Sequence, residues 1–349
     1  MAFFSICVPQ YNRTSFLVAA CRVLETQTFR DFEVCISDDC STDGRGEELR
    51  RYLDSSGLNV VYRGQELNRR YDGNLREAIS LASGRFCLLM GNDDCLASPE
   101  TLERLHNLLI GQPDVGVVIT NFRNYSGDRV FRRVAHTGIV GAGPGVAANC
   151  FRNFSFVSGI LLERQRAQAH LTSRWDGSEM YQMYLACRIL AEGYQLLEID
   201  EVMVRREIQL PGETVDSYAG RPVLNPCPLV ERRVPLVEMG RLVSDAITIG
   251  PRAPERLYLW VFLQILAFPY GYWIFEYRRV QSWKYALGIC LGMRPRNLVG
   301  PLQFRLPHRL AIDGAYAFVS LAGLVTPIRL FTALYSPMYI LAKRLFQPR

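Results

Sequence analysis

The 349-residue sequence is 49% hydrophobic and 21% charged, which is the composition of a folded protein and excludes an intrinsically disordered chain. Its net charge of +6 is unevenly placed: residues 251–349 carry 13 lysines and arginines against 3 acidic residues, whereas residues 1–250 carry 27 against 31. Length predicts more than one domain, and the sequence pattern changes to helices from about residue 228. We therefore expect a first domain over residues 1–227 and a basic, helical second region over residues 228–349.

Short apolar runs and amphipathic segments alternate over the first 120 residues. We expect strands over residues 4–8, 32–37, 58–62, 86–90 and 115–120, and helices over residues 15–27, 45–54, 72–83 and 99–110. This alternation predicts parallel β-α-β units. The expected fold class is therefore α/β, with a doubly wound, mostly parallel sheet.

The ends of these elements carry signals of their own. Thr14 or Ser15 is the expected N-cap of the first helix, and Pro99 suits the first turn of the fourth helix. Pro9 is expected to end the first strand, and Gly84 the third helix.

The ten cysteines and four histidines lack the spacing of a zinc site, and no Cys-x-x-Cys pair occurs. Cysteines such as Cys7, Cys35 and Cys87 lie inside apolar runs, which predicts buried, reduced thiols in a cytosolic protein. No signal peptide is expected, because the apolar stretch over residues 3–8 is too short and lacks a basic flank.

A polar cluster follows the first, second and fourth predicted strands. The three clusters are Tyr11-Asn12-Arg13, Asp38-Asp39 and Asn92-Asp93-Asp94. Each alone is compatible with a turn. In open α/β sheets, however, the carboxyl ends of the strands meet at the edge where ligands bind, so three clusters in register favour a ligand site.

The residue types in these clusters suit a nucleotide. Tyr11 can stack on a base, and Asp38 or Asp39 can accept hydrogen bonds from that base. Arg13 can reach a phosphate, and a divalent metal ion at Asp94 would neutralise a departing diphosphate. Neither a Gly-x-Gly-x-x-Gly fingerprint nor a Walker-type loop is present in the sequence. A nucleotide held by carboxylates and a metal is therefore favoured.

Three stretches resemble the family 2 inverting glycosyltransferases, which have the GT-A fold. Ser-Ile-Cys-Val-Pro-Gln-Tyr-Asn-Arg at residues 5–13 resembles the opening strand of that family. Residues 38–44 resemble its second-strand motif, with Cys40 where glycine is more usual. Residues 91–94 resemble its metal-binding Asp-x-Asp region, with Asn92 in place of the first acid. The resemblance covers about residues 3–210 and leaves out the basic C-terminal region.

The resemblance implies roles for the residues at these positions. Tyr11 and Asp39 would hold the base, and Asp93 would contact the donor near its ribose or sugar. Asp94 would ligate Mn²⁺ or Mg²⁺. The expected donor-binding set comprises Pro9, Tyr11, Arg13, Asp38, Asp39, Asn68, Arg70, Asp93 and Arg206.

Inversion requires a general base that takes the proton of the acceptor hydroxyl. In the family this base is a carboxylate near the start of a helix, and residues 175–188 occupy that place here. The usual Glu-Asp pair is absent, and alignment on Arg188 puts Tyr181-Gln182 there. We expect Glu179 to be the base and Asp176 to be the alternative, although an acid in a first helical turn also suits the helix dipole.

Arg205 and Arg206 follow a strand-like run over residues 198–204 and suit either a diphosphate clamp or a solvated pair. Residues 207–225, which contain two prolines and two glycines, are expected to form a loop that closes over the donor.

The C-terminal region contains three apolar runs, over residues 257–275, 314–328 and 330–342, with arginines between them. Pro269 and Gly271 are expected to break the first run. Broken apolar helices with basic and aromatic flanks predict a monotopic anchor on an anionic membrane surface. A spanning or re-entrant helix and a soluble helical appendage are the alternatives. The long uncharged runs argue against nucleic-acid binding.

The resemblance and the apolar region together imply a glycosyltransferase at the cytoplasmic face of the inner membrane. The expected donor is a nucleotide sugar, UDP-linked by default, and the expected acceptor is a glycan on a polyprenyl diphosphate. The setting would be O-antigen, capsule or exopolysaccharide assembly. Two alternatives stay open: transfer directly to polyprenyl phosphate, and a non-catalytic membrane-bound module that binds a sugar nucleotide.

Overall fold

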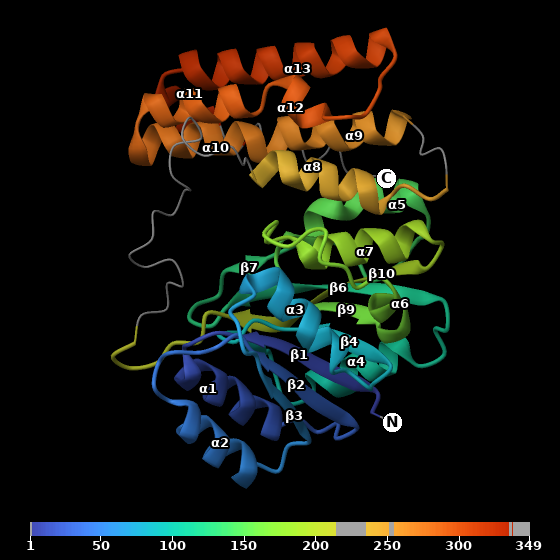
Figure 1. Cartoon of the computed structure of the whole chain (residues 1–349), viewed down its shortest axis with the longest axis vertical. Helices are drawn as coiled ribbons and strands as arrows, with labels where there is room; N and C mark the ends of the chain where they lie inside the picture. The colour runs from blue at the N-terminus through green and yellow to red at the C-terminus, as the bar shows by residue number, and fades with distance from the viewer. Residues whose placement is uncertain (1, 214–234, 251–254, 335–336, 338–349) are drawn as a thin grey trace. The chain divides into compact units, whose positions relative to one another are not determined.

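The computed structural model describes residues 2–213, 235–250, 255–334 and 337. It divides into two compact units, Met1–Ser217 and Tyr218–Arg349, each of which is described by itself (Figure 1). The predicted boundary after residue 227 lies outside the described residues, as does the predicted loop from residue 214 onward.

Within the described residues, ten strands of unit 1 form one sheet in the order β3-β2-β1-β4-β9-β6-β10-β5, with β7 paired to β6 and β8 to β10. The strands are β1 (Phe4–Gln10), β2 (Phe32–Asp38), β3 (Val60–Gly64), β4 (Phe86–Leu89), β5 (Cys95–Leu96), β6 (Val115–Asn124), β7 (Val130–Phe131), β8 (Gly138–Gly141), β9 (Ile160–Glu163) and β10 (Gln195–Arg206).

The sheet is mostly parallel, as predicted. Strands β3, β2, β1 and β4 are parallel neighbours, and β6 is parallel to β10. The sequence pattern did not predict β9, which lies between β4 and β6 and runs antiparallel to both. Strands β4 and β6 therefore share one direction, and a short reversed strand lies at the centre of the sheet.

The described helices of unit 1 cover and connect these strands. They are α1 (Thr14–Glu25), α2 (Gly46–Ser55), α3 (Arg70–Ser80), α4 (Thr101–Leu109), α5 (Pro144–Cys150), α6 (Arg164–Ala169) and α7 (Tyr181–Ala191), with one 3₁₀ turn, η1 (Phe151–Ser155). Helix α3 packs against β1 and β2, and α1 lies beside α2 (Figure 1).

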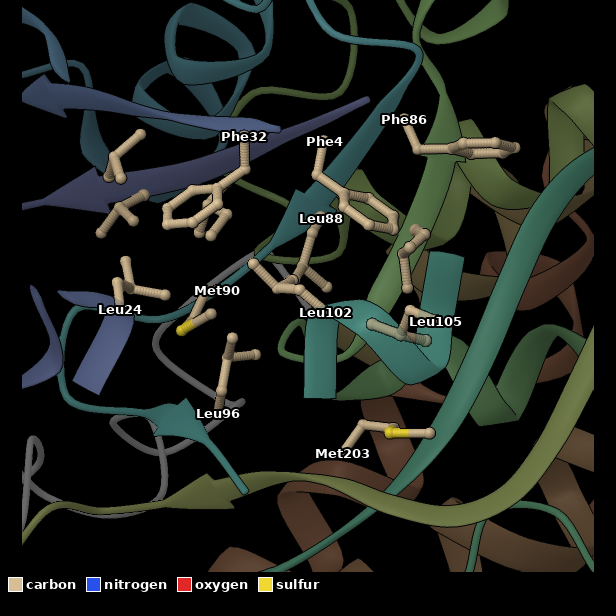
Figure 2. Packing of buried hydrophobic residues seen from close by; sticks show 14 of the residues in the cluster. Phe4, Leu24, Phe32, Phe86, Leu88, Met90, Leu96, Leu102, Leu105 and Met203 are labelled. Atoms are coloured by element: carbon tan, nitrogen blue, oxygen red, sulfur yellow. The ribbon is translucent and has the colours of Figure 1, made fainter. Parts of the chain in front are cut away.

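A hydrophobic core joins the strands to α1 and α4. Figure 2 shows Phe4, Phe32, Phe86 and Leu88 of the strands, with Leu102 and Leu105 of α4 in the same cluster. All six side chains are 6% exposed or less. Burial of each contributes roughly 1.5–3 kcal/mol, and the core fixes the strands whose ends carry the polar clusters.

Several predicted element ends were wrong. Strand β1 continues through Pro9 to Gln10. Proline is tolerated there because the neighbouring strand β4 ends at Leu89, opposite Cys7, so no residue of β4 pairs with Pro9. Helix α4 begins at Thr101, beyond Pro99. Helix α1 has no side-chain N-cap of its own, since the Thr14 N–H donates to Asp43 Oδ2 at 3.0 Å.

Gly84 does not close α3, which ends at Ser80, and instead precedes β4. A Cβ added to Gly84 would lie 2.8 Å from the backbone carbon of Phe4. Real Cβ contacts do not come this close, so Gly84 is required where β4 enters the sheet beside β1.

Unit 2 is helical throughout its described residues. Its elements are α8 (Pro235–Ala246), α9 (Glu255–Ile265), η2 (Leu266–Tyr270), α10 (Gly271–Glu276), η3 (Tyr277–Gln281), α11 (Trp283–Gly292), α12 (Pro295–Val299) and α13 (Leu306–Val325).

The predicted break at Pro269 and Gly271 is absent. Helices α9 and α10 join into one continuous helix through η2, a π-helical turn that contains Pro269. Proline lacks the N–H that an α-helix needs, and its ring clashes with the carbonyl four residues earlier. A π-turn shifts that pairing by one residue and accommodates proline without ending the helix.

Among the described residues, one helix, Glu255–Arg279, is long and apolar enough to cross a membrane, and half of its most apolar window is buried. A second candidate exists only if Leu306–Val325 and Ile328–Leu334, which are bent by 120°, count as one span.

Candidate active site

The candidate site lies at the carboxyl ends of β1, β2 and β4. Gln10 is the register partner of Asp38, and Cys7 is the partner of Leu89, so these neighbouring strands end at the same edge. The residues that follow them are the three polar clusters of the sequence. The structure thus brings the predicted donor residues of all three stretches to one edge of the sheet.

Asp39 and Asp38, the two predicted partners of a base, have different surroundings. Asp38 accepts from the Tyr62 hydroxyl at 2.7 Å and from the Ser41 N–H at 2.9 Å, so both of its oxygens are engaged within the fold. Asp39 is 1% exposed, and its Oδ1 accepts from the Arg69 N–H at 2.6 Å. Burial raises the pKa of Asp39, against the effect of this hydrogen bond. Asp39 also accepts from the Arg70 N–H, so both carboxylates are engaged within the fold.

Asn68 and Arg70 are tied to Asp39. The Asn68 side-chain N–H donates to the Asp39 carbonyl at 3.1 Å, and its oxygen accepts from the Arg70 N–H at 3.0 Å. The segment before α3 is therefore held against the second polar cluster. Pro9 is half-buried within β1, and the Tyr11 ring is 39% exposed at the end of that strand.

The backbone around the site is strained. Among the described non-glycine residues, those with positive φ are Asn12, Arg13, Cys40, Arg70, Glu179 and Glu207. All six lie just after a strand or at the start of a helix, at positions that carry the predicted site residues or neighbour them. Such conformations cost about 1–3 kcal/mol each and concentrate at functional sites.

Asn92, which replaces the first acid of the resembled motif, has a structural explanation. Its Nδ2 donates to Gln10 Oε1 at 2.8 Å and to the Asn12 carbonyl at 3.3 Å. A carboxylate at this position would face two acceptors. The amide therefore ties the acidic loop to the end of β1. Asp93 and Asp94 are then the carboxylates of this motif.

Asp93 and Asp94 have different environments. Asp93 pairs with Arg13, whose Nη1 lies 2.7 Å from its Oδ2. Asp94 is 3% exposed and accepts from the Ser158 hydroxyl and, at 2.9 Å, from the Glu207 N–H. Burial, followed by the charge of Asp93, raises the pKa of Asp94 to about 7. A cation beside this pair would favour its fully charged form.

Ser158 and Arg133 support Asp94, and neither was predicted from the sequence. Ser158 accepts from the Gly91 N–H at 2.9 Å while its hydroxyl donates to Asp94. Arg133 donates to the Ser158 carbonyl at 2.9 Å and to the Phe156 and Thr120 carbonyls at 2.9 and 2.7 Å. Nothing local in the sequence indicates this, since Arg133 lies between two short strands.

The predicted bases lie before α7. Asp176 forms an ion pair with Arg76, which donates from Nη2 to Asp176 Oδ2 at 3.0 Å. The Glu179 side chain is exposed, and its backbone is left-handed with φ 58°. Glu179 is therefore the more accessible of the two carboxylates.

Asp72 holds Glu179 in place, and this role was also not predicted. The buried Asp72 carboxylate accepts from the Glu179 N–H at 2.9 Å and from the Tyr181 N–H at 3.1 Å. A carboxylate of α3 thus caps the start of α7. Burial raises the pKa of Asp72, against these hydrogen bonds.

Gln182 is one of the two residues that alignment on Arg188 puts at the place of the family's Glu-Asp pair. It is 1% exposed and donates to the Phe154 and Ser155 carbonyls at 3.2 and 3.3 Å. Its oxygen accepts from the Tyr71 hydroxyl at 3.0 Å. An amide has no basic lone pair for proton transfer, so Gln182 has a structural role.

Arg206, at the end of β10, is half-buried rather than fully solvated. Its Nε donates to Asn124 at 2.8 Å, and its guanidinium lies over the Phe131 ring at 4.4 Å. Arg205 is also half-buried, and its buried Nε has no hydrogen-bond partner among the described residues.

Residues 5–169 match the sequence model described as Glycosyl transferase family 2. The match covers a little under half of the chain, and the matched segment, residues 5–169, is called the family 2 domain. It contains each predicted donor residue except Arg206, and the predicted base region follows it.

Two curated relatives of the family 2 domain are named for their activities. Abequosyltransferase RfbV of Salmonella typhimurium is 35% identical over 113 residues, 32% of this chain and 34% of RfbV. GalNAc(5)-diNAcBac-PP-undecaprenol beta-1,3-glucosyltransferase of Campylobacter jejuni is 29% identical over 94 residues, 27% of this chain and 30% of that enzyme. Each match spans about a third of the relative's own length.

Solved structures share the fold of the family 2 domain and extend the likeness beyond it. TarS residues 1–349 of S. aureus in complex with UDP superposes with a TM-score of 0.61 at 17% identity, covering 92% of this chain and 91% of that one. Mannosyltransferase PcManGT of Pyrobaculum calidifontis, in complex with GDP-Man and Mn²⁺, has a TM-score of 0.53 at 18% identity, covering 98% and 87%.

The family 2 domain offers two carboxylates to a divalent ion. A Cβ added to Gly91 would lie 3.1 Å from Asp94 Oδ2 and 3.2 Å from Asp93 Oδ1, so the two side chains converge over a glycine. The described residues contain no group of three or more His, Cys, Asp or Glu side chains that could hold a metal by itself. Asp93 and Asp94 therefore fit an ion whose remaining ligands are substrate phosphates and water.

Proposed function

We propose that this protein is an inverting glycosyltransferase that moves a sugar from a nucleotide-sugar donor to a polyprenyl-diphosphate-linked glycan. The observation that carries the proposal is the convergence of Tyr11, Asp39, Asp93 and Asp94 at one edge of the sheet in a family 2 domain. An aromatic ring, a buried carboxylate and an acidic pair are what a base, its polar edge and a metal-bound diphosphate require.

In the proposed reaction the acceptor hydroxyl attacks the anomeric carbon as the bond to the donor diphosphate breaks. Glu179 takes the proton of that hydroxyl, and one displacement inverts the anomeric carbon. Mn²⁺ or Mg²⁺ at Asp94, when bound, would neutralise the departing diphosphate. Arg13, paired with Asp93, and Arg206 are the basic side chains proposed to contact the phosphates.

The ligands bound in solved relatives support the proposed donor, and the name of one relative supports the proposed acceptor. TarS has been solved with UDP and with UDP-GlcNAc, and PcManGT with GDP-Man and Mn²⁺. The name of the Campylobacter jejuni enzyme specifies an undecaprenol-linked glycan acceptor. A UDP-sugar is the proposed default donor, and the cytoplasmic membrane face is the proposed site of action. Transfer directly to polyprenyl phosphate would use the same donor chemistry.

A second candidate function is a non-catalytic module that binds a sugar nucleotide. The observation that favours it is Gln182, which is a buried, hydrogen-bonded amide and which alignment on Arg188 puts at the place of the family's base. Both functions would bind the nucleotide sugar at the same edge of the sheet. They differ in whether the sugar is then transferred to an acceptor.

Substitution of the predicted base separates the two functions. We expect Glu179→Gln to lower kcat roughly 100-fold or more, since a positioned general base contributes about 10²–10⁴, and to leave donor affinity unchanged. The measurement is release of nucleoside diphosphate from UDP-, dTDP-, GDP- and CDP-sugars with polyprenyl-diphosphate-linked saccharides. Glu47→Gln is the matched control, since Glu47 is an exposed acid in the first turn of α2.

The outcomes are distinct. Loss of turnover in Asp176→Asn with normal turnover in Glu179→Gln would move the base to Asp176. Donor binding by the wild type without turnover on any acceptor would favour the binding module.

A further inference from the structure

Helix α13 is apolar on two opposite faces. One face packs inside unit 2: Ile312 is fully buried, and the Ser320 hydroxyl lies 2.6 Å from that of Tyr270. A Cβ added to Gly323 would lie 2.8 Å from Ile274 Cγ2, so α13 and α10 are in close contact there. The residues of this face are therefore packed against other helices of unit 2.

The other face of α13 is exposed. Its large side chains are Leu306 (70% exposed), Leu310 (59%), Phe318 (72%), Leu321 (66%) and Val325 (68%). The exposed small residues on the same face are Pro307, Ala311, Gly314 and Ala317. The spacing of three and four residues makes one continuous stripe, and the acid that falls within it, Asp313, pairs with Arg309 at 3.4 Å. At about 1.5 Å per residue the stripe is about 28 Å long.

Basic side chains lie at both ends of this stripe. The Arg305 side chain is 85% exposed just before α13, and Arg329 is exposed just after it. Residues 251–349 carry 13 basic residues against 3 acidic ones. A second copy of the chain would bring the same positive charge to the stripe, whereas an anionic lipid surface offers acyl chains to the apolar residues and headgroups to the arginines.

The surroundings of the long apolar helix favour a surface location over a spanning one. Helix α8 packs on α9 so closely that a Cβ added to Gly240 would lie 3.0 Å from the Phe262 ring. Helix α8 carries Glu238, Arg241 and Asp245. A charged helix in contact with residues 255–279 would be costly to place in hydrocarbon, whereas the Arg309–Asp313 pair of α13 is part-exposed and can stay at the headgroup level of a surface-bound helix.

We propose that the exposed stripe of α13, residues 306–325, docks on an anionic membrane with the helix axis in the membrane plane. The inference rests on the proposed function for its setting, since a lipid-linked acceptor lies at that surface. This proposal assigns the membrane contact to α13, whereas the longest uncharged run of the sequence, residues 257–275, belongs to the neighbouring helix Glu255–Arg279.

The test is co-sedimentation of the full chain with vesicles of phosphatidylcholine alone and with added phosphatidylglycerol. We expect the wild type to bind the anionic vesicles. Phe318→Ser combined with Leu321→Ser should lower the apparent affinity at least tenfold. Ile110→Ser combined with Ile139→Ser is the matched control, since both are exposed apolar residues of unit 1, at 60% and 42%. This control should bind as the wild type does.

Leu310→Ser provides a second, independent variant on the stripe and should weaken binding in the same direction. Unchanged vesicle binding in both stripe variants would overturn the proposal. So would a wild-type dimer in light scattering that the stripe variants convert to monomer, because the stripe would then be a self-interface.

Nucleotide binding distinguishes this inference from the proposed function. If the stripe variants lose vesicle binding but keep the thermal shift with UDP and Mn²⁺, the docking surface is supported and the donor site is unaffected. If the wild type binds vesicles through the stripe but shows no shift with any nucleotide, the proposed function fails and the docking surface stands.

Discussion

At the residue scale, the acidic pair depends on a relay of hydrogen bonds. Arg133 fixes the backbone at Ser158, and the Ser158 hydroxyl in turn donates to the buried Asp94. Residues that orient a metal ligand without contacting the metal typically change its affinity 10–100-fold when removed. Ser158 and Arg133 are therefore positioning residues for the proposed donor site.

We expect Ser158→Ala to weaken Mn²⁺ binding in the presence of UDP about tenfold, because Asp94 loses a donor that lowers its pKa. Titration of Mn²⁺ against a saturating nucleotide measures this. Ser126→Ala, at an exposed turn, is the control. A structural role alone would lower the melting temperature without changing the Mn²⁺ titration, and that result would contradict the relay.

At the element scale, the fit of Gly84 shows how closely the site strands pack. Gly84→Ala should destabilise the protein by about 1–3 kcal/mol, since the added methyl group meets the Phe4 backbone at 2.8 Å. Gly46→Ala, where nothing lies within 4 Å of the added Cβ, should be neutral or slightly stabilising in helix α2. Urea denaturation of both variants measures the difference, and equal effects would show that β4 can shift to admit a side chain.

The elements that sequence predicted best are those with local signals. Alternation of apolar runs predicted β1, β2 and β4, and polar residues after each strand predicted the edge where Tyr11, Asp39 and Asp94 lie. Helix starts were harder, because α1 and α7 are capped by Asp43 and Asp72 from other segments.

Strand β9 and the unbroken helix through Pro269 were missed for similar reasons. A four-residue strand carries no mark of its direction, and the partners β4 and β6 make it antiparallel. The π-turn at Pro269 is compatible with helix on both sides, so tertiary packing rather than composition decides whether the chain breaks there.

At the scale of the whole molecule, the two units divide the proposed tasks. Unit 1 presents carboxylates and arginines at one sheet edge, and unit 2 presents an apolar stripe with basic ends. The uneven distribution of charge along the sequence predicts this division. It does not predict which helix faces outward, since α13 and the helix below it are similarly apolar.

The proposed function depends most on one property, which is that the sheet edge of unit 1 binds a nucleotide with a metal at Asp94. Thermal melting with UDP, dTDP, GDP and CDP, each with Mn²⁺ and with a chelator, tests it most directly. Ligand at about 100 times Kd stabilises the folded state by about 2.7 kcal/mol, which raises the melting temperature by several degrees. Asp54→Ala, an exposed acid on α2, is the control for Asp94→Ala.

We expect a shift with one nucleotide that requires Mn²⁺, persists in Asp54→Ala and disappears in Asp94→Ala. That result would establish the donor site and identify the base. The absence of a shift in the wild type with all four nucleotides would contradict the proposed donor site.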